Sequence, residues 1–123
     1  MGLIDTTSAD DIRALATATA SPVVVVPVYN APHETLRCLE SLLRHTPPQH
    51  LILLVDDCGP DRSFFETLAS TPIPHDRQVA VFHMPSNQGF IGACNTAFDL
   101  AGRHDVVLVN SDVVVGPESV SYT

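Results

Sequence analysis

The sequence predicts an α/β fold in which a mainly parallel sheet lies between two layers of helices. Apolar runs alternate along the chain with segments of helical periodicity, in the order β-α-β-α-β-α-β after an opening helix. The run Val23–Val28 is almost entirely β-branched, which is typical of a strand that helices cover on both faces. Because parallel strands need crossover connections, we expect a three-layer α/β/α arrangement.

The first half of the chain contains two helical segments on either side of the Val23–Val28 strand. Residues 8–19 predict a helix, which Ser8 or Asp10 can cap. After the strand, Pro32 suits a helix start, and leucines then repeat at helical spacing up to Arg44. Pro47 and Pro48 end that helix.

The second half repeats the same alternation. The expected elements, in order, are a strand at Leu51–Val55, a helix at Arg62–Ala69, a strand at Gln78–His83, a helix at 90–101, a strand at Asp105–Val109 and a short strand at Val113–Val115. Gly102 is a suitable stop for the last helix.

The composition excludes several classes of partner. Acidic residues outnumber basic ones 14 to 6, and the net charge of −8 argues against nucleic-acid phosphate and against unaided docking on anionic lipid. The three cysteines form no CxxC pair and are interpreted as free thiols. No apolar stretch is long enough to span a bilayer, and the N-terminus does not resemble a secretion signal, so we expect a cytoplasmic protein.

Acidic turns follow the predicted strands at 51–55 and 105–109. The first reads Asp56-Asp57-Cys58-Gly59-Pro60-Asp61, and the second reads Asn110-Ser111-Asp112. Ligands of parallel sheets bind outside the carboxyl ends of the strands, so both turns are candidates for one site. The chain contains neither GxGxxG nor GxxxxGK[ST], which excludes the usual dinucleotide and P-loop sites. An aspartate turn can instead hold a divalent cation that neutralises phosphate.

Less specific interpretations of these residues remain open. The Asp56-Asp57 pair and the Asn110–Asp112 segment can be turn formers, and Tyr29 can belong to the core. A receiver domain also has an acidic pair and a later aspartate, but it needs a lysine, and all six basic residues here are arginines. A nucleotidyltransferase would need a glycine-rich basic loop after the Val23–Val28 strand, which is absent.

Five stretches together resemble the N-terminal half of the family 2 glycosyltransferases, which have the GT-A fold. They cover about residues 22–117 and comprise Val23–Asn30, the helix with Leu36, Cys38, Leu39, Ser41 and Leu42, the segment Leu54–Asp57, the segment Asn87–Asn95, and Leu108–Asp112. The resemblance implies a truncated GT-A domain, with a helical extension at 1–21 and the donor-binding half at 22–123. The NxGF pattern at Asn87–Phe90 resembles the branch with bacterial rhamnosyltransferase-like enzymes.

The resemblance also implies roles for individual residues. Pro27 and Tyr29 would line the pocket for the nucleobase and ribose, Asp57 would accept a hydrogen bond from the base, and Asp56 would support the same turn. Asn110-Ser111-Asp112 matches the DXD motif. In it, Ser111 would contact the nucleotide, and Asp112 would hold Mn²⁺ or Mg²⁺. The segment with Asn87, Gly89 and Asn95 would run beneath the donor.

The implied activity is inverting transfer from a UDP- or dTDP-sugar to a hydroxyl of a saccharide or lipid-linked acceptor. The family's catalytic base lies in the second half of the domain, so we expect these 123 residues to bind nucleotide weakly and to transfer no sugar. The alternative is a non-catalytic nucleotide-binding or assembly module of the same fold. The apolar strand at Val106–Val109 would be an exposed edge, so we expect homo-oligomers. The full-length protein would act at the inner face of the membrane.

Overall fold

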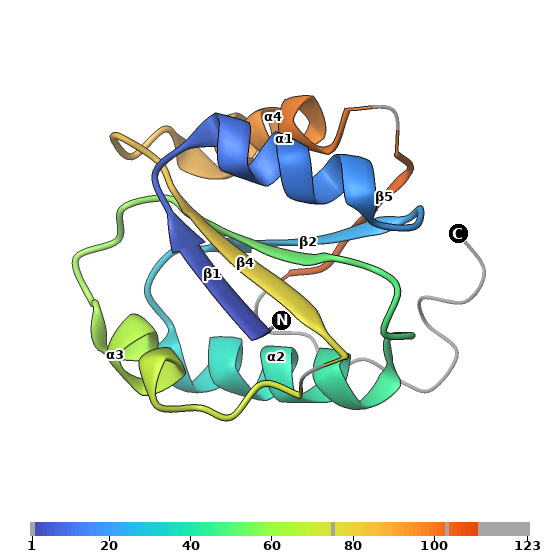
Figure 1. The fold of residues 1–123 in the computed structure, drawn as a ribbon. Coiled ribbons are helices and arrows are strands. Elements are labelled where there is room, and N and C mark those ends of the chain that lie inside the picture. Colours follow the sequence, from blue (N-terminus) through green and yellow to red (C-terminus); the bar gives the residue numbers. More distant parts are fainter. Residues whose placement is uncertain (1, 75, 103, 111–123) are drawn as a thin grey trace.

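The sheet contains five parallel strands in the order β1-β4-β3-β2-β5. The computed structural model describes residues 2–74, 76–102 and 104–110 (Figure 1). The strands are β1 (Gly2–Thr6), β2 (Val23–Val28), β3 (Ile52–Asp56), β4 (Gln78–His83) and β5 (Val106–Leu108). The register places Val24 beside Ile52 and Val107, so β2 lies between β3 and β5.

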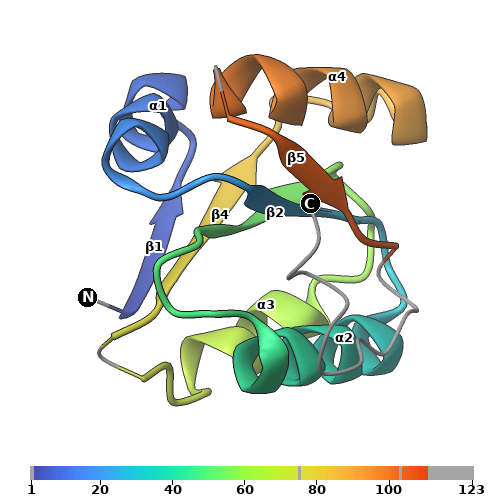
Figure 2. The ribbon, with the colours of Figure 1, turned by 90° about the vertical axis from the view of Figure 1, so that its right-hand side faces the viewer.

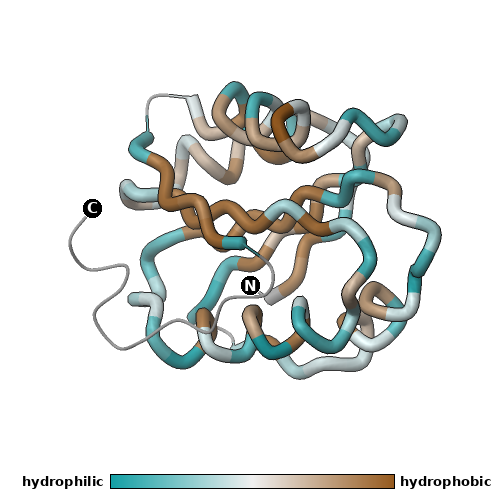
Figure 3. Tube along the Cα trace, turned by 180° about the vertical axis from the view of Figure 1, so that it is seen from behind, coloured by the Kyte–Doolittle hydropathy of each residue, from teal (hydrophilic) through white to brown (hydrophobic). Residues whose placement is uncertain are grey.

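Two helices cover each face of the sheet (Figures 1 and 2). They are α1 (Ala9–Ala18) and α4 (Gly89–Ala101) on one face, and α2 (Pro32–His45) and α3 (Ser63–Ala69) on the other. Successive side chains of a strand point to opposite faces. Val24 and Val26 therefore join the apolar cluster under α2 and α3, and Val23 and Val25 join the cluster under α1 and α4. Figure 3 shows the resulting apolar middle layer. The predicted α/β/α fold is confirmed.

The N-terminal segment corrects the sequence prediction. Residues 1–21 were expected to form a helical extension, but the described part of this segment contains a strand as well as a helix. Strand β1 pairs with β4 along its whole length, from Gly2 beside Gln78 to Thr6 beside Phe82. A run with only Leu3 and Ile4 as large apolar residues carries little strand signal of its own, and the pairing with β4 supplies the rest.

The other elements lie close to their predicted positions. The strand at Gln78–His83 is confirmed residue for residue, and Ser8 caps α1 as expected, because its side chain accepts a hydrogen bond from the Asp11 amide. Strand β3 runs one residue further than predicted and includes Asp56. The predicted strand at Val113–Val115, together with Ser111 and Asp112, lies outside the described residues.

The path of the chain defines the end of the sheet where a ligand would bind. From β2 the chain moves outward through β3 to β4, by way of α2 and α3. It then crosses on the other face through α4 and returns to β5, on the opposite side of β2. The carboxyl ends of β2 and β5 therefore form a topological switch point, the usual place of a ligand crevice in such sheets.

Candidate functional site

The turns at the carboxyl ends of β2 and β3 have unusual backbone conformations. Asn30, Ala31 and Cys58 have φ angles of 53°, 52° and 60°, a region that residues other than glycine seldom adopt. The two turns also dock on each other, since the Asp61 amide donates to Asn30 Oδ1 at 2.9 Å. A Cβ at Gly59 would lie 2.6 Å from the same oxygen, so this contact requires glycine. Backbone strain of this kind concentrates at functional sites.

Asp56 is buried at the end of β3, and both of its carboxylate oxygens accept hydrogen bonds. The Arg62 guanidinium donates to Oδ1 at 3.1 Å and to Oδ2 at 2.6 Å. His83 Nδ1 lies 2.6 Å from Oδ2, and the Cys58 amide donates to Oδ1 at 3.0 Å. Asp56 and the following Asp57 are both buried, with 2% and 3% of their surface exposed, so they differ in their partners and not in their burial. The four hydrogen bonds to Asp56 occupy both of its oxygens, and this side chain fixes the turn that follows β3.

The partners of Asp56 keep its carboxylate ionised. Burial alone would raise the pKa of Asp56, but the hydrogen bonds from Arg62, His83 and the Cys58 amide, with the Arg62 charge, lower it below its usual range. The hydrogen bond to Asp56 in turn raises the pKa of Arg62. These opposing charges therefore stabilise each other at the end of the sheet.

Asp57 differs from Asp56 in its partners. Its amide donates to the Val28 carbonyl at 3.0 Å, which holds the residue beside the end of β2. Its Oδ1 accepts a hydrogen bond from the Gln88 amide, immediately before α4, at 2.8 Å. Within residues 2–74, 76–102 and 104–110, no cationic side chain forms an ion pair with Asp57. Asp57 is therefore the acidic residue of the pair whose charge no side chain of this region offsets.

The other predicted site residues of the described region surround this turn. Pro27 is buried inside β2, beside Val55, whereas Tyr29 is 50% exposed just after the strand. Asn87 closes a small turn by accepting from the Gly89 amide at 3.1 Å. Gly89 has a φ of 78°, so glycine suits this first residue of α4. Asn95 is exposed on α4, one to two turns further along.

The predicted metal-binding segment is described only at its first residue. Asn110 is exposed after β5, and its carbonyl accepts from the Cys38 thiol at 3.6 Å. Ser111 and Asp112 lie outside the described residues. Among the residues that the structure describes, no group of three or more His, Cys, Asp or Glu side chains could hold a metal ion.

The sequence interpretation missed three members of this site: Arg62, His83 and Asp5. His83 was taken only as the last residue of a strand, and it lies directly beside Asp56 in the parallel register. Its Nε2 contacts Asp5 of β1. Parallel strands place their last residues side by side. A histidine and an aspartate at the ends of two such strands could therefore have predicted the contact between His83 and Asp56.

Cys58 lies in the same turn but is not a reactive thiol. Its Sγ donates to the Met84 carbonyl at 2.9 Å. Burial, together with the charges of Asp56 and Asp57, raises the pKa of the Cys58 thiol. The expectation of free cysteines holds, since Cys38, Cys58 and Cys94 form no disulfide. The thiol of Cys58 therefore serves the structure of the turn.

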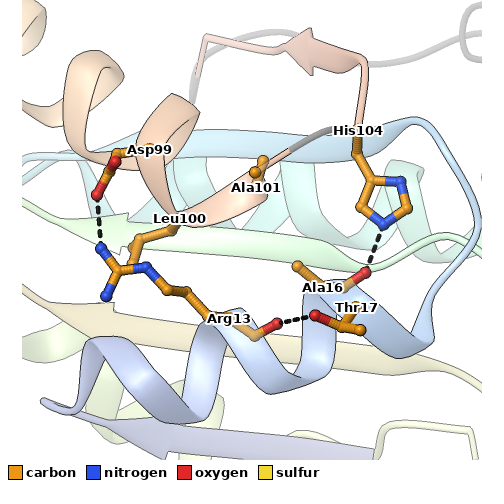
Figure 4. Close-up of a pocket in the computed structure, with 8 residues that line it drawn as sticks. Arg13, Ala16, Thr17, Asp99, Leu100, Ala101 and His104 are labelled. Carbon is orange, nitrogen blue, oxygen red and sulfur yellow. Dashed lines mark hydrogen bonds and ion pairs between the residues drawn. The ribbon is translucent and has the colours of Figure 1, made fainter.

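A cavity of the described region lies away from these turns, between α1 and α4. It has a volume of about 520 Å³ and is lined by Arg13, Ala16, Thr17, Asp99, Leu100, Ala101, Gly102 and His104 (Figure 4). These residues belong to the last turns of both helices and to the start of the connection to β5, which places the cavity at the amino end of the sheet. Arg13 is already paired with Asp99 at 2.6 Å.

No helix among the described residues is both long enough and apolar enough to cross a bilayer.

Comparison with known proteins identifies the family. The sequence model of "Glycosyl transferase family 2" matches residues 23–122. The chain is 32% identical over 92 residues to Glycosyltransferase GlyG of Streptococcus pneumoniae, which covers 75% of this chain and 30% of that protein. It is 34% identical over 89 residues to the uncharacterized glycosyltransferase EpsJ of Bacillus subtilis, covering 72% of this chain and 25% of that protein. The chain thus spans less than a third of the length of these relatives.

Solved structures agree with the predicted GT-A architecture. The TarS 1-349 structure of S. aureus in complex with UDP has a TM-score of 0.65 at 25% identity, covering 80% of this chain and 29% of that one. The mannosyltransferase PcManGT from Pyrobaculum calidifontis, in complex with GDP-Man and Mn²⁺, has a TM-score of 0.66 at 19% identity, covering 90% of this chain and 41% of that one. The family match covers most of the chain and the sheet has the architecture of these transferases, so this chain belongs to glycosyl transferase family 2.

Proposed function

We propose that the carboxyl end of the sheet binds a nucleotide-diphosphate sugar, with UDP or dTDP as the nucleotide. In the protein that contains this chain, the sugar would pass to an acceptor hydroxyl with inversion. The observation that carries the proposal is the contrast between the two acidic neighbours at the end of β3. Asp56 is fully engaged by Arg62 and His83, whereas Asp57 keeps a charge that no described side chain offsets.

The position of Asp57 suits recognition of a nucleobase. A carboxylate that accepts the imide N–H of uracil or thymine forms a charge-assisted hydrogen bond. The backbone bond from Asp57 to Val28 holds the residue next to the end of β2, and Tyr29 follows at once with half of its surface exposed. An exposed aromatic ring there offers the base an apolar surface. The buried Pro27 would fix the direction from which the chain leaves β2.

The diphosphate would lie toward Asn87 and Gly89, where α4 begins. The amino ends of α2 and α4 both face this end of the sheet, because each helix directly follows a strand. Unpaired amide groups and the helix dipole favour a negative charge at such ends. Asn95, one to two turns along α4, and Ser111 would complete the polar surroundings of the donor.

Mn²⁺ or Mg²⁺ would be held by Asp112 together with oxygens of the donor diphosphate. Mg²⁺ in particular is commonly bound by one or two carboxylates plus substrate phosphates. When bound, the cation would offset the negative charge on the departing diphosphate.

The relatives support the class of ligand. TarS has been solved with UDP, and PcManGT has been solved with GDP-Man and Mn²⁺. We propose hexosyl or rhamnosyl transfer to a saccharide or a lipid-linked acceptor, in polysaccharide assembly on the cytoplasmic side of the membrane. The catalytic base would lie outside these 123 residues, so the chain alone would bind the donor without transferring sugar.

A second copy of the chain is the expected partner at the edge of the sheet. Among the described residues, β5 pairs only with β2, and Leu108 is 40% exposed. Unpaired strand edges favour association. Light scattering at high protein concentration tests this expectation, and a clean monomer would contradict it.

The proposed function is tested by isothermal titration of the chain with UDP, dTDP, GDP and ADP, each with and without Mn²⁺. We expect binding of UDP or dTDP that strengthens with Mn²⁺, and a matching rise in thermal stability, since a ligand at about 100 times its Kd adds about 2.7 kcal/mol. Preference for GDP would overturn the assignment of the base. Absence of binding by every nucleotide would overturn the donor site as a property of this chain.

A further inference from the structure

Four charged side chains of alternating sign form a cluster across the carboxyl ends of β1, β4 and β3. The charge cluster consists of Asp5, His83, Asp56 and Arg62. His83 lies between two carboxylates, with Nδ1 at 2.6 Å from Asp56 Oδ2 and Nε2 in contact with Asp5 Oδ1. Arg62 closes the cluster with a bidentate bond to Asp56.

The geometry of the charge cluster places both ring nitrogens of His83 against carboxylate oxygens. An ionised carboxylate can only accept hydrogen bonds, so each ring nitrogen must carry a proton to bond its partner. A neutral imidazole would instead turn a lone pair toward one of the two carboxylates. The charged groups that face the ring are Asp5 from β1 and Asp56 from β3. From α3, the Phe65 ring lies 5.3 Å from the His83 ring, centroid to centroid. A protonated His83 would donate to both carboxylates, and the charges of the four side chains would then cancel.

The charge cluster controls the turn that carries Asp57. Asp56 Oδ1 accepts the Cys58 amide, and Arg62 also donates to the Gly59 carbonyl at 3.2 Å. These bonds hold the chain on both sides of Asp57 and keep Cys58 in its unfavourable backbone conformation. A loss of charge balance at Asp56 would therefore release the turn rather than only weaken one contact.

The charge cluster also links the turn to a part of the chain outside the family match. That match begins at residue 23. Asp5 belongs to β1, which pairs with β4 through the register from Gly2 to Thr6. The first strand thus contributes a charged group to the support of the candidate donor site, in addition to extending the sheet.

We propose that His83 is a positioning residue for nucleotide binding, which acts as a charged link between Asp5 of β1 and Asp56 and so holds Asp57 in place. The inference rests on the proposed function, because it assumes that Asp57 meets the nucleotide. The effect of His83 on the turn that carries Asp57 does not depend on any ligand and can be measured separately.

The test uses the full chain with the variants His83→Asn and Asp5→Asn. Asparagine at 83 can still donate to Asp56 but carries no charge and does not reach Asp5, and the matched control is His45→Asn in the last turn of α2. Three quantities are measured: the ¹⁵N shifts of the His83 ring at pH 7, amide hydrogen exchange at Cys58 and Gln88, and the Kd for UDP or dTDP with Mn²⁺.

In the wild type we expect ring shifts of an imidazolium. In His83→Asn, the amides of Cys58 and Gln88 should exchange about tenfold faster, while those of α2 keep their rates, because a hydrogen bond between charged groups is lost locally. The Kd should rise about three- to tenfold in the same variant, and less in Asp5→Asn. The control should change none of these quantities.

Several outcomes would overturn the inference. A neutral His83 ring removes its basis. Exchange that rises evenly over the whole chain, or not at all, shows that His83 contributes only to general stability. Loosening of the turn with an unchanged Kd refutes the link to nucleotide binding. A wild type that binds no nucleotide, with the turn still loosened in His83→Asn, refutes the proposed function and leaves the hold of His83 on the turn established.

Discussion

The two ends of the sheet differ in what they offer a ligand: the carboxyl end has the charged and polar groups, and the amino end has a cavity. The carboxyl end contains the strained turns at Asn30 and Cys58, the charge cluster and the side chain of Asp57, which forms no ion pair with a described residue. The amino end contains a cavity of about 520 Å³, with mainly small or apolar side chains and an exposed ion pair (Figure 4). A ligand site chosen by cavity volume would therefore lie at the amino end of the sheet, and one chosen by its polar groups would lie at the carboxyl end.

The polarity of the helices favours the carboxyl end as the site. Helices α2 and α4 begin there and end at the amino end, because each follows a parallel strand. Their positive dipole ends therefore face an incoming anion at the carboxyl end, and the negative end of α4 faces the cavity. A chain with a net charge of −8 needs such local features to attract a diphosphate. The carboxyl end of the sheet is therefore the better candidate for the nucleotide site.

The largest expected effect is on stability, from Asp56→Ala. Removal of this carboxylate leaves Arg62 and His83 without their shared partner. Breaking a buried pair costs about 3–5 kcal/mol. Arg62 is 44% exposed and can recover water, so we expect a loss of about 2–3 kcal/mol in the free energy of unfolding. Chemical denaturation checks it, with the exposed Asp10→Ala as a control that should change stability by less than about 0.5 kcal/mol. Equal effects of the two variants would refute the special role of Asp56.

A smaller loss of stability but a larger loss of binding is expected for Asp57→Ala. The variant loses the hydrogen bond from the Gln88 amide, which contributes about 1 kcal/mol to stability. Its main effect should be a rise of about tenfold to a hundredfold in the Kd for UDP or dTDP, because a charge-assisted bond to the base is lost. Titration calorimetry of Asp57→Ala and Asp57→Asn measures this. Unchanged affinity in both would exclude Asp57 from the nucleotide site.

Sequence patterns predicted the strands, the helices and the acidic pair at the carboxyl end, but not which side chains contact each other there. The β-branched run Val23–Val28 and the leucines of α2 identified a buried parallel sheet covered by helices, because burial on both faces leaves a strong local pattern. The acidic pair at Asp56 and Asp57 was also visible. Nothing local distinguished the two residues, since their difference arises from Arg62 and from His83, 27 residues away.

Strand β1 shows a second limit of local patterns. Two apolar residues, Leu3 and Ile4, are too few to predict a strand, and the strand exists because β4 offers it a partner. Its Asp5 then reaches the site through His83, a contact between residues 78 positions apart. Contacts of this kind follow from strand register, which a single sequence does not state for an edge strand.

The dependence of stability on pH provides a third test of the carboxyl end. Hydrogen bonds and the Arg62 charge outweigh burial and lower the pKa of Asp56 below its ordinary value of 3.8. A lowered pKa in the folded state gives stability that is fully present above 3.8 and is lost as the pH falls through the folded value. The stability gap between the wild type and Asp56→Asn should therefore narrow as the pH falls below about 4. Denaturant titrations across this range measure the gap, and a gap that widens in acid would contradict the sign.

The smallest expected effect comes from the amino end. Arg13→Ala removes the ion pair with Asp99, whose two side chains are 49% and 71% exposed, so we expect a change of less than about 0.5 kcal/mol in stability. Because the cavity lies at the end of the sheet away from Asp57, the Kd for nucleotide should stay the same. If Arg13→Ala weakened nucleotide binding as much as Asp57→Ala, the ligand would occupy the cavity between α1 and α4. The cavity would then indicate the binding site better than the polar groups at the carboxyl end of the sheet.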